Sequence, residues 1–129
     1  MMLKDKIVVI TGGAGLIGKE FVKSVIDEGG IAVIADIDKK RGIEATKATE
    51  KYSKSKNVFF VNLDITSKTS IKECIAIVHK KYGKIDALVN NAYPRNKNYG
   101  NHFFDIEYDD FVYNLGSNLG GCIIPVSYT

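Results

Sequence analysis

The sequence lacks the cysteine pattern of a metal site or of a disulfide-linked domain. Its 129 residues contain two cysteines, Cys74 and Cys122, with neither metal-ligand spacing nor a neighbouring cluster of histidines. Two thiols so far apart in sequence favour a reducing compartment over a disulfide scaffold. We therefore expect no metal ion, and we expect the protein to be cytoplasmic.

The sequence also lacks a long hydrophobic run. No apolar segment approaches the roughly 20 residues that a membrane-spanning helix needs. The first residues include Lys4, Asp5 and Lys6, and they lack the long apolar segment of a signal peptide. These absences predict that the protein has no membrane partner.

The sequence also lacks a large excess of either positive or negative charge. The formal net charge is +3, and the lysines are scattered among acidic residues without a basic run or interleaved aromatics. This pattern is typical of a solvated surface and argues against a nucleic-acid partner. The hydrophobic content of 45% and the length fit one globular domain over residues 1–129.

What the sequence does contain is a glycine-dense turn between a predicted strand and a predicted helix. The apolar run from Ile7 to Ile10 is typical of a buried strand, and Ile17, Phe21 and Val25 recur at helical spacing. Glycines in such a turn permit a sharp bend, a close approach of the backbone to a pyrophosphate, and tight packing of the helix on the sheet. The G-x-G-x-x-G fingerprint consists of Gly13, Gly15 and Gly18.

One carboxylate decides between two interpretations of this turn, because a glycine-rich turn alone is more typical of a simple connection between core elements. Asp36 lies 18 residues after Gly18, at the end of a second apolar run from Ile31 to Ala35. A carboxylate in that place accepts hydrogen bonds from an adenosine ribose, so the combination favours dinucleotide binding. Its charge would repel the 2′-phosphate of NADP, so we expect NAD as the cofactor, although the basic Lys39 and Arg41 follow closely.

The rest of the chain alternates short apolar runs with helical segments. Further strands are predicted at Val58–Val61 and Ile85–Val89, and further helices at Asp38–Ser53 and from a Ser70–Glu73 capping box to Gly83. A last helix is predicted from near Asp109, while Gly116, Gly120, Gly121 and Pro125 argue against its later turns. This alternation predicts an α/β fold with a doubly wound parallel sheet, the Rossmann fold.

Four motifs in this order resemble the short-chain dehydrogenase/reductase family over nearly the whole chain. They are T-G-G-A-G-L-I-G at residues 11–18, Asp64 after the third strand, N-N-A-Y at residues 90–93, and Asn118 in N-L-G-G. The resemblance implies NAD(P)-dependent oxidation or reduction of a hydroxyl/carbonyl pair, and strands in the order 3-2-1-4.

The same resemblance implies roles for individual residues. The pyrophosphate turn would comprise Gly12, Gly13, Gly15, Leu16, Ile17 and Gly18, while Asp36 would bind the adenine ribose. Asp64 and Ile65 would contact adenine, and Asn90 and Ala92 would flank the nicotinamide ribose. Asn118 would be the one member of the catalytic set, holding a water in the proton relay.

Two residues depart from the family pattern. Leu16 stands where compact members carry glycine, and Tyr93 replaces the glycine after N-N-A. The Tyr93 phenol either shapes the substrate side of the cleft or covers the strand end. The stretch of residues 90–100 is similar to oxidoreductases of bacterial flagellin glycan modification, which implies a sugar derivative as the small-molecule substrate.

The family's serine and Y-x-x-x-K pair are missing from their expected positions. Tyr52–Lys56 and Tyr93–Lys97 match the spacing, but neither occupies the family position. We therefore expect a truncated cofactor-binding portion, inactive alone and marginally stable, with an open sheet edge at residues 85–89. The helix around residues 111–119 would pack against a second subunit in a homo-oligomer. A nucleotide-binding module without catalysis and a non-functional truncated product are the alternatives.

Overall fold

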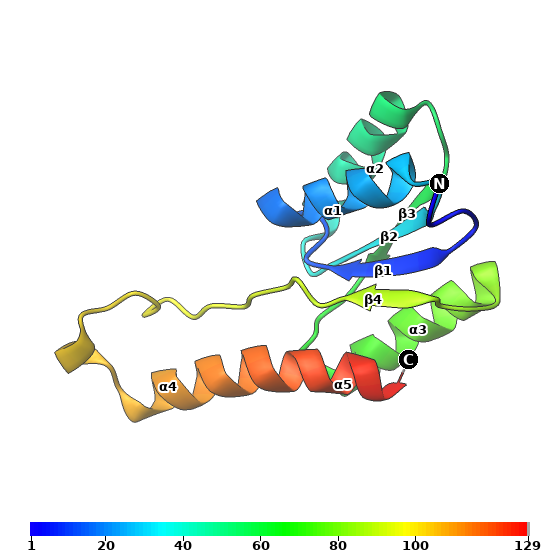
Figure 1. Ribbon diagram of the computed structural model, residues 1–129. Helices are drawn as coiled ribbons and strands as arrows, with labels where there is room; N and C mark the ends of the chain where they lie inside the picture. Colours follow the sequence, from blue (N-terminus) through cyan, green and yellow to red (C-terminus); the bar gives the residue numbers. More distant parts are fainter. Residues whose placement is uncertain (129) are drawn as a thin grey trace.

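Four apolar segments pair as one parallel sheet in the computed structural model, which describes residues 1–128 (Figure 1). The strands are β1 Ile7–Thr11, β2 Ile31–Asp36, β3 Val58–Asn62 and β4 Ala87–Val89. Their order in the sheet is β3-β2-β1-β4, and every pairing is parallel. The predicted doubly wound α/β fold and its strand order are confirmed.

Helices cover both faces of the sheet. Along β1, Ile7 and Val9 pack into one apolar layer and Val8 and Ile10 into the other. Helices α1 and α2 lie over one face, and α3 and α5 lie over the opposite face (Figure 1). Because both faces are covered, the strands are continuously apolar up to their last residues instead of alternating with polar residues. The helices are α1 Leu16–Asp27, α2 Lys39–Ser53, α3 Lys68–Tyr82 and α5 Gly121–Tyr128.

Helix α1 buries a face rotated from the one that its apolar spacing predicts, although Val25 of the predicted face is buried as expected. Ile17 and Phe21 are 66% and 41% exposed, whereas Gly18 and Val22 are buried. A Cβ at Gly18 would collide with the carbonyl oxygen of Gly12 in the preceding turn. The close approach at Gly18 therefore sets the rotation of the helix and turns Ile17 outward.

Helix α3 begins one turn earlier than predicted, and the expected Ser70–Glu73 capping box is wrong. Ser67 is the N-cap, and its hydroxyl accepts a hydrogen bond from the Ser70 N–H at 3.2 Å. The Ser70 hydroxyl instead accepts from the Asp64 N–H at 2.9 Å. Gly83 ends the helix as expected, in the left-handed conformation with φ of 79°.

The C-terminal segment stays helical well beyond its predicted end. Helix α4, Tyr108–Leu115, passes through one π-helical turn, Gly116–Gly120, into α5. Pro125 lies inside α5 and lines a small apolar cavity together with Val9, Leu63 and Ile71. A Cβ on Gly121 would lie 2.6 Å from the Ile65 side chain, so this glycine lets α5 approach the sheet. Tertiary packing here outweighs the low helix propensity of glycine and proline.

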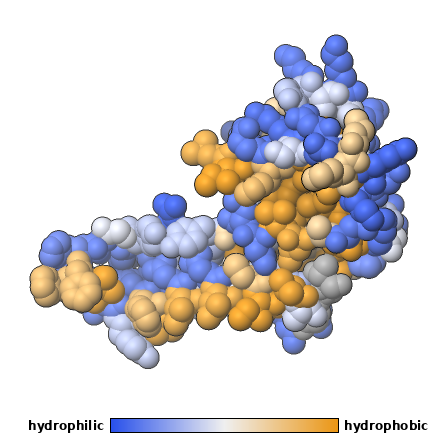
Figure 2. Space-filling view, viewed as in Figure 1, coloured by the Kyte–Doolittle hydropathy of each residue, from blue (hydrophilic) through white to orange (hydrophobic). Residues whose placement is uncertain are grey.

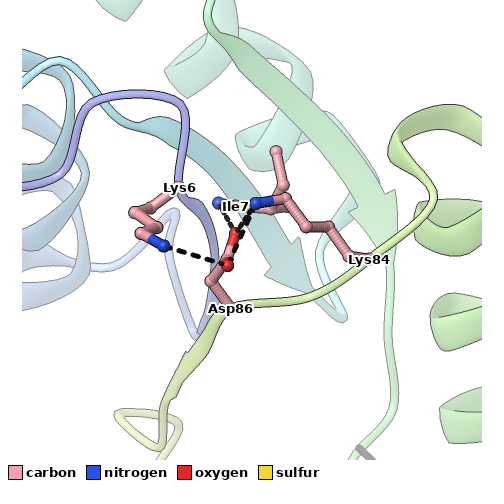
Figure 3. Close-up of polar contacts among 4 residues, drawn as sticks. All are labelled: Lys6, Ile7, Lys84 and Asp86. Atoms are coloured by element: carbon pink, nitrogen blue, oxygen red, sulfur yellow. Dashed lines mark hydrogen bonds and ion pairs between the residues drawn. The ribbon is translucent and has the colours of Figure 1, made fainter.

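Strand β4 is shorter than the predicted Ile85–Val89 because a side chain replaces its first ladder contact. The Asp86 N–H donates to the Ile7 carbonyl at 2.9 Å, and the Ile7 N–H donates back to the Asp86 carboxylate at 2.8 Å. Lys6 and Lys84 lie 3.6 Å and 2.9 Å from the same carboxylate (Figure 3). Asp86 therefore stabilises the amino-terminal end of the sheet, opposite to the edge at which the carboxyl ends of the strands lie.

Helix α4 and its continuation carry an exposed hydrophobic stripe. Figure 2 shows hydrophobic residues gathered along the lower edge of this helix, where it extends away from the sheet. A short 3₁₀ turn, Phe103–Asp105, precedes the helix, and Phe103 and Phe104 are also exposed. The exposed apolar side chains include Phe111, Leu115, Leu119, Ile123 and Val126.

Candidate functional site

The carboxyl ends of all four strands meet at one edge of the sheet. Because the chain leaves β1 toward β2 and later returns to β4 on the other side, the direction of winding reverses between β1 and β4. Such a switch point is where open α/β sheets bind their ligands. The residues that follow β1 and β4 are Gly12 and Asn90, both in the predicted site.

The turn after β1 needs glycine at particular places. Gly12 has φ of +64°, and a Cβ there would lie 3.0 Å from the Ala92 Cα. Gly13 is buried, and a Cβ there would lie 3.0 Å from the Ile10 carbonyl oxygen. Together with the Gly18 contact, these approaches bring the start of α1 against the sheet edge. The first N–H groups of that helix lack intrahelical partners and carry partial positive charge, which suits an anion.

Leu16 and Ile17 form the first turn of α1 just beyond Gly15, which is the N-cap. Both side chains are exposed, with 87% of the Leu16 side chain accessible. Among residues 1–128, the only non-glycine positions with positive φ are Asp5 and Lys54. Leucine therefore replaces the family's usual glycine at position 16 without backbone strain, and its side chain lies outside the turn.

Asp36 lies at the end of β2, next to the glycine turn. Its carboxylate accepts from the Ala14 N–H at 3.1 Å and from the Asp38 N–H at 3.0 Å. A carboxylate has about four acceptor positions, so these two contacts leave capacity for ribose hydroxyls. The Arg41 guanidinium donates to the Ala14 carbonyl at 3.4 Å, which places a cation near the same turn. The sequence pattern does not reveal these backbone contacts.

A cavity of about 300 Å³ lies between the ends of β1, β2 and β3. Five predicted residues line it, namely Gly12, Asp36, Asp64, Ile65 and Ala92. Its wall also includes Ile37 and Tyr113, which sequence reasoning missed. Ile37 directly follows Asp36 and was detectable from that position, whereas Tyr113 lies on α4, far along the chain, and only the tertiary fold brings it to the cavity.

Asp64 has a local structural role in addition to lining this cavity. Its carboxylate accepts from the Thr66 N–H at 2.9 Å and from the Thr66 hydroxyl at 2.6 Å. These bonds close the turn that leads into α3. Asp64 and the neighbouring Ile65, which is buried, therefore present a fixed wall to the cavity.

Asn90 lies apart from this cavity. Its side-chain N–H donates to the Cys122 carbonyl at 3.2 Å and so joins the end of β4 to α5. The next residue, Asn91, makes the closer contact with the glycine turn, because its Nδ2 donates to the carbonyls of Thr11 and Gly12 at 3.1 and 3.2 Å. Asn91 and Thr11 are thus structural site residues that the predicted site set omitted.

Asn118 lies in the π-helical turn, a feature that often marks functional positions. Its Nδ2 donates to the carbonyls of Pro94 and Asn114, at 3.1 and 2.9 Å. Its Oδ1 is buried and has no hydrogen-bond partner among residues 1–128. Asn118 lines a second cavity, of about 680 Å³, that shares Tyr93 with the first. Of the sequence-predicted residues, five therefore line the smaller cavity and Asn118 lines the larger one, while the others lie outside both.

The titratable groups near these cavities show one shift that bears on chemistry. A hydrogen bond between the Tyr93 and Tyr99 hydroxyls, 3.1 Å apart, raises the pKa of Tyr93 above its ordinary value. A tyrosine with a raised pKa is a poor proton acceptor at neutral pH, so Tyr93 in the Tyr93–Lys97 match is unsuited to be the general base. Away from these cavities, on α3, burial in the core raises the pKa of Cys74 to about 11, which leaves this thiol unreactive.

The described residues contain neither a metal site nor a membrane span. Residues 1–128 hold no group of three or more His, Cys, Asp or Glu side chains that could ligate a metal ion. In the same range, no helix combines the length and the apolar character required to cross a membrane.

Known proteins match this chain over most of its length. The short chain dehydrogenase family model matches residues 6–122. Post-translational flagellin modification protein A of Campylobacter coli is 35% identical over 95% of this chain and 48% of its own length. The 7alpha-hydroxysteroid dehydrogenase of Bacteroides fragilis is 33% identical over 98% of this chain and 50% of its own length. The chain thus spans about half the length of these curated relatives.

A solved structure agrees with the fold. The putative short-chain dehydrogenase of Novosphingobium aromaticivorans superposes with a TM-score of 0.85 at 29% sequence identity, over 98% of this chain and 46% of that one. Both resemblances expected from the motifs, to the dehydrogenases and to flagellin modification proteins, are confirmed by these matches.

Proposed function

Since the chain belongs to the short-chain dehydrogenase/reductase family, we propose that it binds a nicotinamide dinucleotide for an oxidoreductase reaction on a hydroxyl/carbonyl pair. The observation that carries the proposal is the 3.1 Å contact between the Asp36 carboxylate and the Ala14 N–H. Through it, the carboxylate suited to a ribose and the turn suited to a pyrophosphate adjoin at one cavity. Two parts of one dinucleotide can therefore bind side by side.

The residues present fit this cofactor. The glycine turn and the N-terminus of α1 would hold the pyrophosphate, with Gly12, Gly13, Gly15 and Gly18 keeping the turn close and Leu16 and Ile17 supplying N–H groups. Asp36 would accept from the adenine ribose, and Asp64 and Ile65 would contact adenine. Ala92 and Asn90 would lie toward the nicotinamide ribose, with Asn90 acting through its link to α5. When bound, the nicotinamide ring supplies the hydride acceptor or donor.

Asn118 is the proposed catalytic residue of this chain. Its unpartnered buried Oδ1 is an acceptor suited to a water in a proton relay, because buried acceptors generally require a donor. The bond from its Nδ2 to the Pro94 carbonyl fixes the orientation of the amide. Asn118 would thus hold the water without exchanging a proton itself.

We further propose NAD over NADP, a sugar derivative as the substrate, and a homo-oligomer formed through the exposed stripe of α4. The charge of Asp36 supports the first choice. The similarity to a flagellin modification protein supports the second. The exposed apolar side chains support the third, and the two free cysteines suit a cytoplasmic location.

Cofactor binding is tested by titrating the chain with NADH and NADPH and following nucleotide fluorescence. We expect NADH to bind at least about tenfold more tightly, a difference of about 1.4 kcal/mol. Asp36→Asn should remove this preference, because it deletes the charge and keeps an acceptor. Asp38→Asn is the matched control, because Asp38 lies two residues away as the N-cap of α2 and asparagine also caps helices, and it should retain the preference. Failure of both nucleotides to bind the native chain would refute the proposed function.

A further inference from the structure

The larger cavity, of about 680 Å³, has the size of a small-molecule site. It lies between α4 and the loop of residues 93–101, and Figure 1 shows this loop running alongside α4. Tyr93 lines both this cavity and the smaller one assigned to the dinucleotide, so the two spaces adjoin. Asn118, the proposed catalytic residue, also lines the larger cavity. A substrate in it would therefore have one end beside the cofactor.

Apolar side chains make up most of the wall of this cavity. They come from the loop, from the segment before α4, and from α4 with its continuation, and they are Tyr93, Tyr99, Ile106, Phe111, Leu115 and Leu119. The two tyrosine rings meet edge to face, with centroids 5.8 Å apart, and form an aromatic wall on the loop side. On the helix side, Phe111 lies seven residues before Asn118, which corresponds to roughly 10 Å of helix. The apolar wall therefore extends well beyond the reacting end of a substrate.

The polar side chains on the wall are four uncharged amides and one carboxylate. The amides belong to Asn98, Asn101, Asn114 and Asn118, and the carboxylate belongs to Asp110. The Asp110 carboxylate accepts from Asn96 Nδ2 at 2.6 Å and from Asn98 Nδ2 at 3.0 and 3.1 Å. These amide donors hold the loop against α4 and orient the carboxylate, but they do not neutralise its negative charge.

No cation compensates the charge of Asp110. Within residues 1–128, no ion pair involves Asp110, and no lysine or arginine lines the cavity. Arg95 packs over the rings of Tyr93 and Tyr99 and is not part of the lining. From residue 98 onward, the sequence contains four acidic residues and no lysine or arginine. An acidic ligand in the cavity would therefore be repelled, whereas an uncharged apolar ligand would not.

We propose that this cavity binds an uncharged, apolar part of the substrate, an aryl or alkyl substituent on the sugar derivative proposed above. The hydroxyl or carbonyl group that reacts lies at the end near Asn118 and Tyr93, and the apolar substituent lies along Phe111 and Leu115. Asp110 is a specificity-determining residue, because its charge excludes acidic substituents. The inference rests on the proposed function, because it defines the substrate class of that dehydrogenase site.

The test measures binding of three probes to the full chain by two-dimensional NMR, with and without NADH. Phenyl β-D-glucoside carries an uncharged apolar substituent, glucose lacks the substituent, and 4-carboxyphenyl β-D-glucoside adds a carboxylate to the ring. We expect phenyl glucoside to shift the Leu115 methyl signals and to bind at least about tenfold more tightly than glucose, because its ring leaves water. It should bind about fivefold more tightly than the carboxyphenyl glucoside, because Asp110 repels the carboxylate.

One pair of variants tests the apolar wall. Leu115→Ala should weaken binding of phenyl glucoside about threefold and leave glucose binding unchanged, because apolar contact area is lost. Val112→Ala is the matched control. Val112 lies on the same helix, is 46% exposed against 51% for Leu115, and lines neither cavity. This control should leave both affinities unchanged.

A second pair of variants tests the charge. Asp110→Asn should bring the affinity for the carboxyphenyl glucoside to within about twofold of that for phenyl glucoside, because the repelling charge is removed. Asp109→Asn removes an equal charge from the first turn of α4, outside the lining, and should keep the difference at about fivefold. A general loosening of the loop would lower both affinities together, so their ratio reports the charge itself.

The outcomes separate this inference from the proposed function. Binding of NADH together with equal affinity for the three probes would overturn the inference and leave the proposed function intact. Equal losses in Leu115→Ala and Val112→Ala would also overturn it. Binding of phenyl glucoside at Leu115 without any binding of NADH would support the apolar cavity while refuting the proposed function.

One further outcome concerns the exposed stripe of α4, which shares Phe111, Leu115 and Leu119 with the cavity wall. Analytical ultracentrifugation of native chain and Leu115→Ala shows whether this wall joins two subunits. If the variant changes the oligomeric state and no probe affinity, the wall is an interface between copies of this chain, and the inference is overturned.

Discussion

The hydroxyl of Thr11, at the end of β1, accepts hydrogen bonds from the backbone N–H groups of Asn91 and Ala92, at 3.0 and 3.1 Å. The same hydroxyl lies 3.3 Å from the Val89 carbonyl, to which it donates. One buried side chain thus closes the gap between β1 and β4 at the point where the direction of winding reverses. The contact joins residues about 80 positions apart in the sequence.

Thr11→Val should therefore lower the free energy of unfolding by about 1–3 kcal/mol, because two N–H groups lose their acceptor inside the structure. Thr11→Ser keeps the hydroxyl and should lose no more than about 1 kcal/mol, the value of one buried methyl group. Urea unfolding gives both numbers, and hydrogen exchange should accelerate at residues 91 and 92 in the valine variant. Equal losses in the two variants would show that the methyl group, and not the hydroxyl, stabilises this junction.

Gly18→Ala should destabilise the protein by about 3 kcal/mol or more and abolish dinucleotide binding. The added Cβ would collide with the Gly12 carbonyl and lie 2.8 Å from the Gly13 Cα, so the turn must open. Thermal unfolding and an NADH titration measure the two effects.

The matched control for that change is Gly120→Ala, which also places alanine in a helical segment. A Cβ there would meet nothing within 4 Å, and alanine has the higher helix propensity by up to about 1 kcal/mol. We expect unchanged or increased stability and retained NADH binding. A loss as large as that of Gly18→Ala would mean that general glycine flexibility, not the close approach to Gly12, is what matters.

Acid should weaken the amino-terminal end of the sheet through Asp86. The Ile7 N–H, followed by the Lys84 ammonium, lowers the pKa of the Asp86 carboxyl below its ordinary value near 3.8. Because the pKa is lower in the folded state, the stabilisation is complete above pH 3.8 and is lost as the pH falls below it toward the folded-state pKa. Unfolding midpoints measured between pH 6 and pH 2.5 should fall less steeply for Asp86→Asn than for the native chain. Parallel curves would exclude Asp86 as a source of the acid sensitivity.

The sequence by itself determined which segments form strands and helices and which residues form the glycine turn, because both depend on residues that are neighbours in the sequence. Apolar runs and helical spacing identify β1 to β3 and the first three helices, and the position of Asp36 after β2 follows from the same pattern. The glycine fingerprint of Gly13, Gly15 and Gly18 belongs to this local class.

The tertiary structure alone decided the rotation of α1, because the approach of Gly18 to Gly12 overrides the spacing of Ile17 and Phe21. It also continued the C-terminal helix past Pro125, since the packing of Ile124 on the core and the close approach of Gly121 to Ile65 offset the low helix propensity of glycine and proline. Thr11 with Asn91, and Asp110 with Asn96 and Asn98, meet only after the chain has folded back. Hydrogen bonds between segments so far apart in the sequence depend on tertiary packing, which no local periodicity encodes. For that reason, the residues that form the walls of both cavities were identified only from the three-dimensional structure.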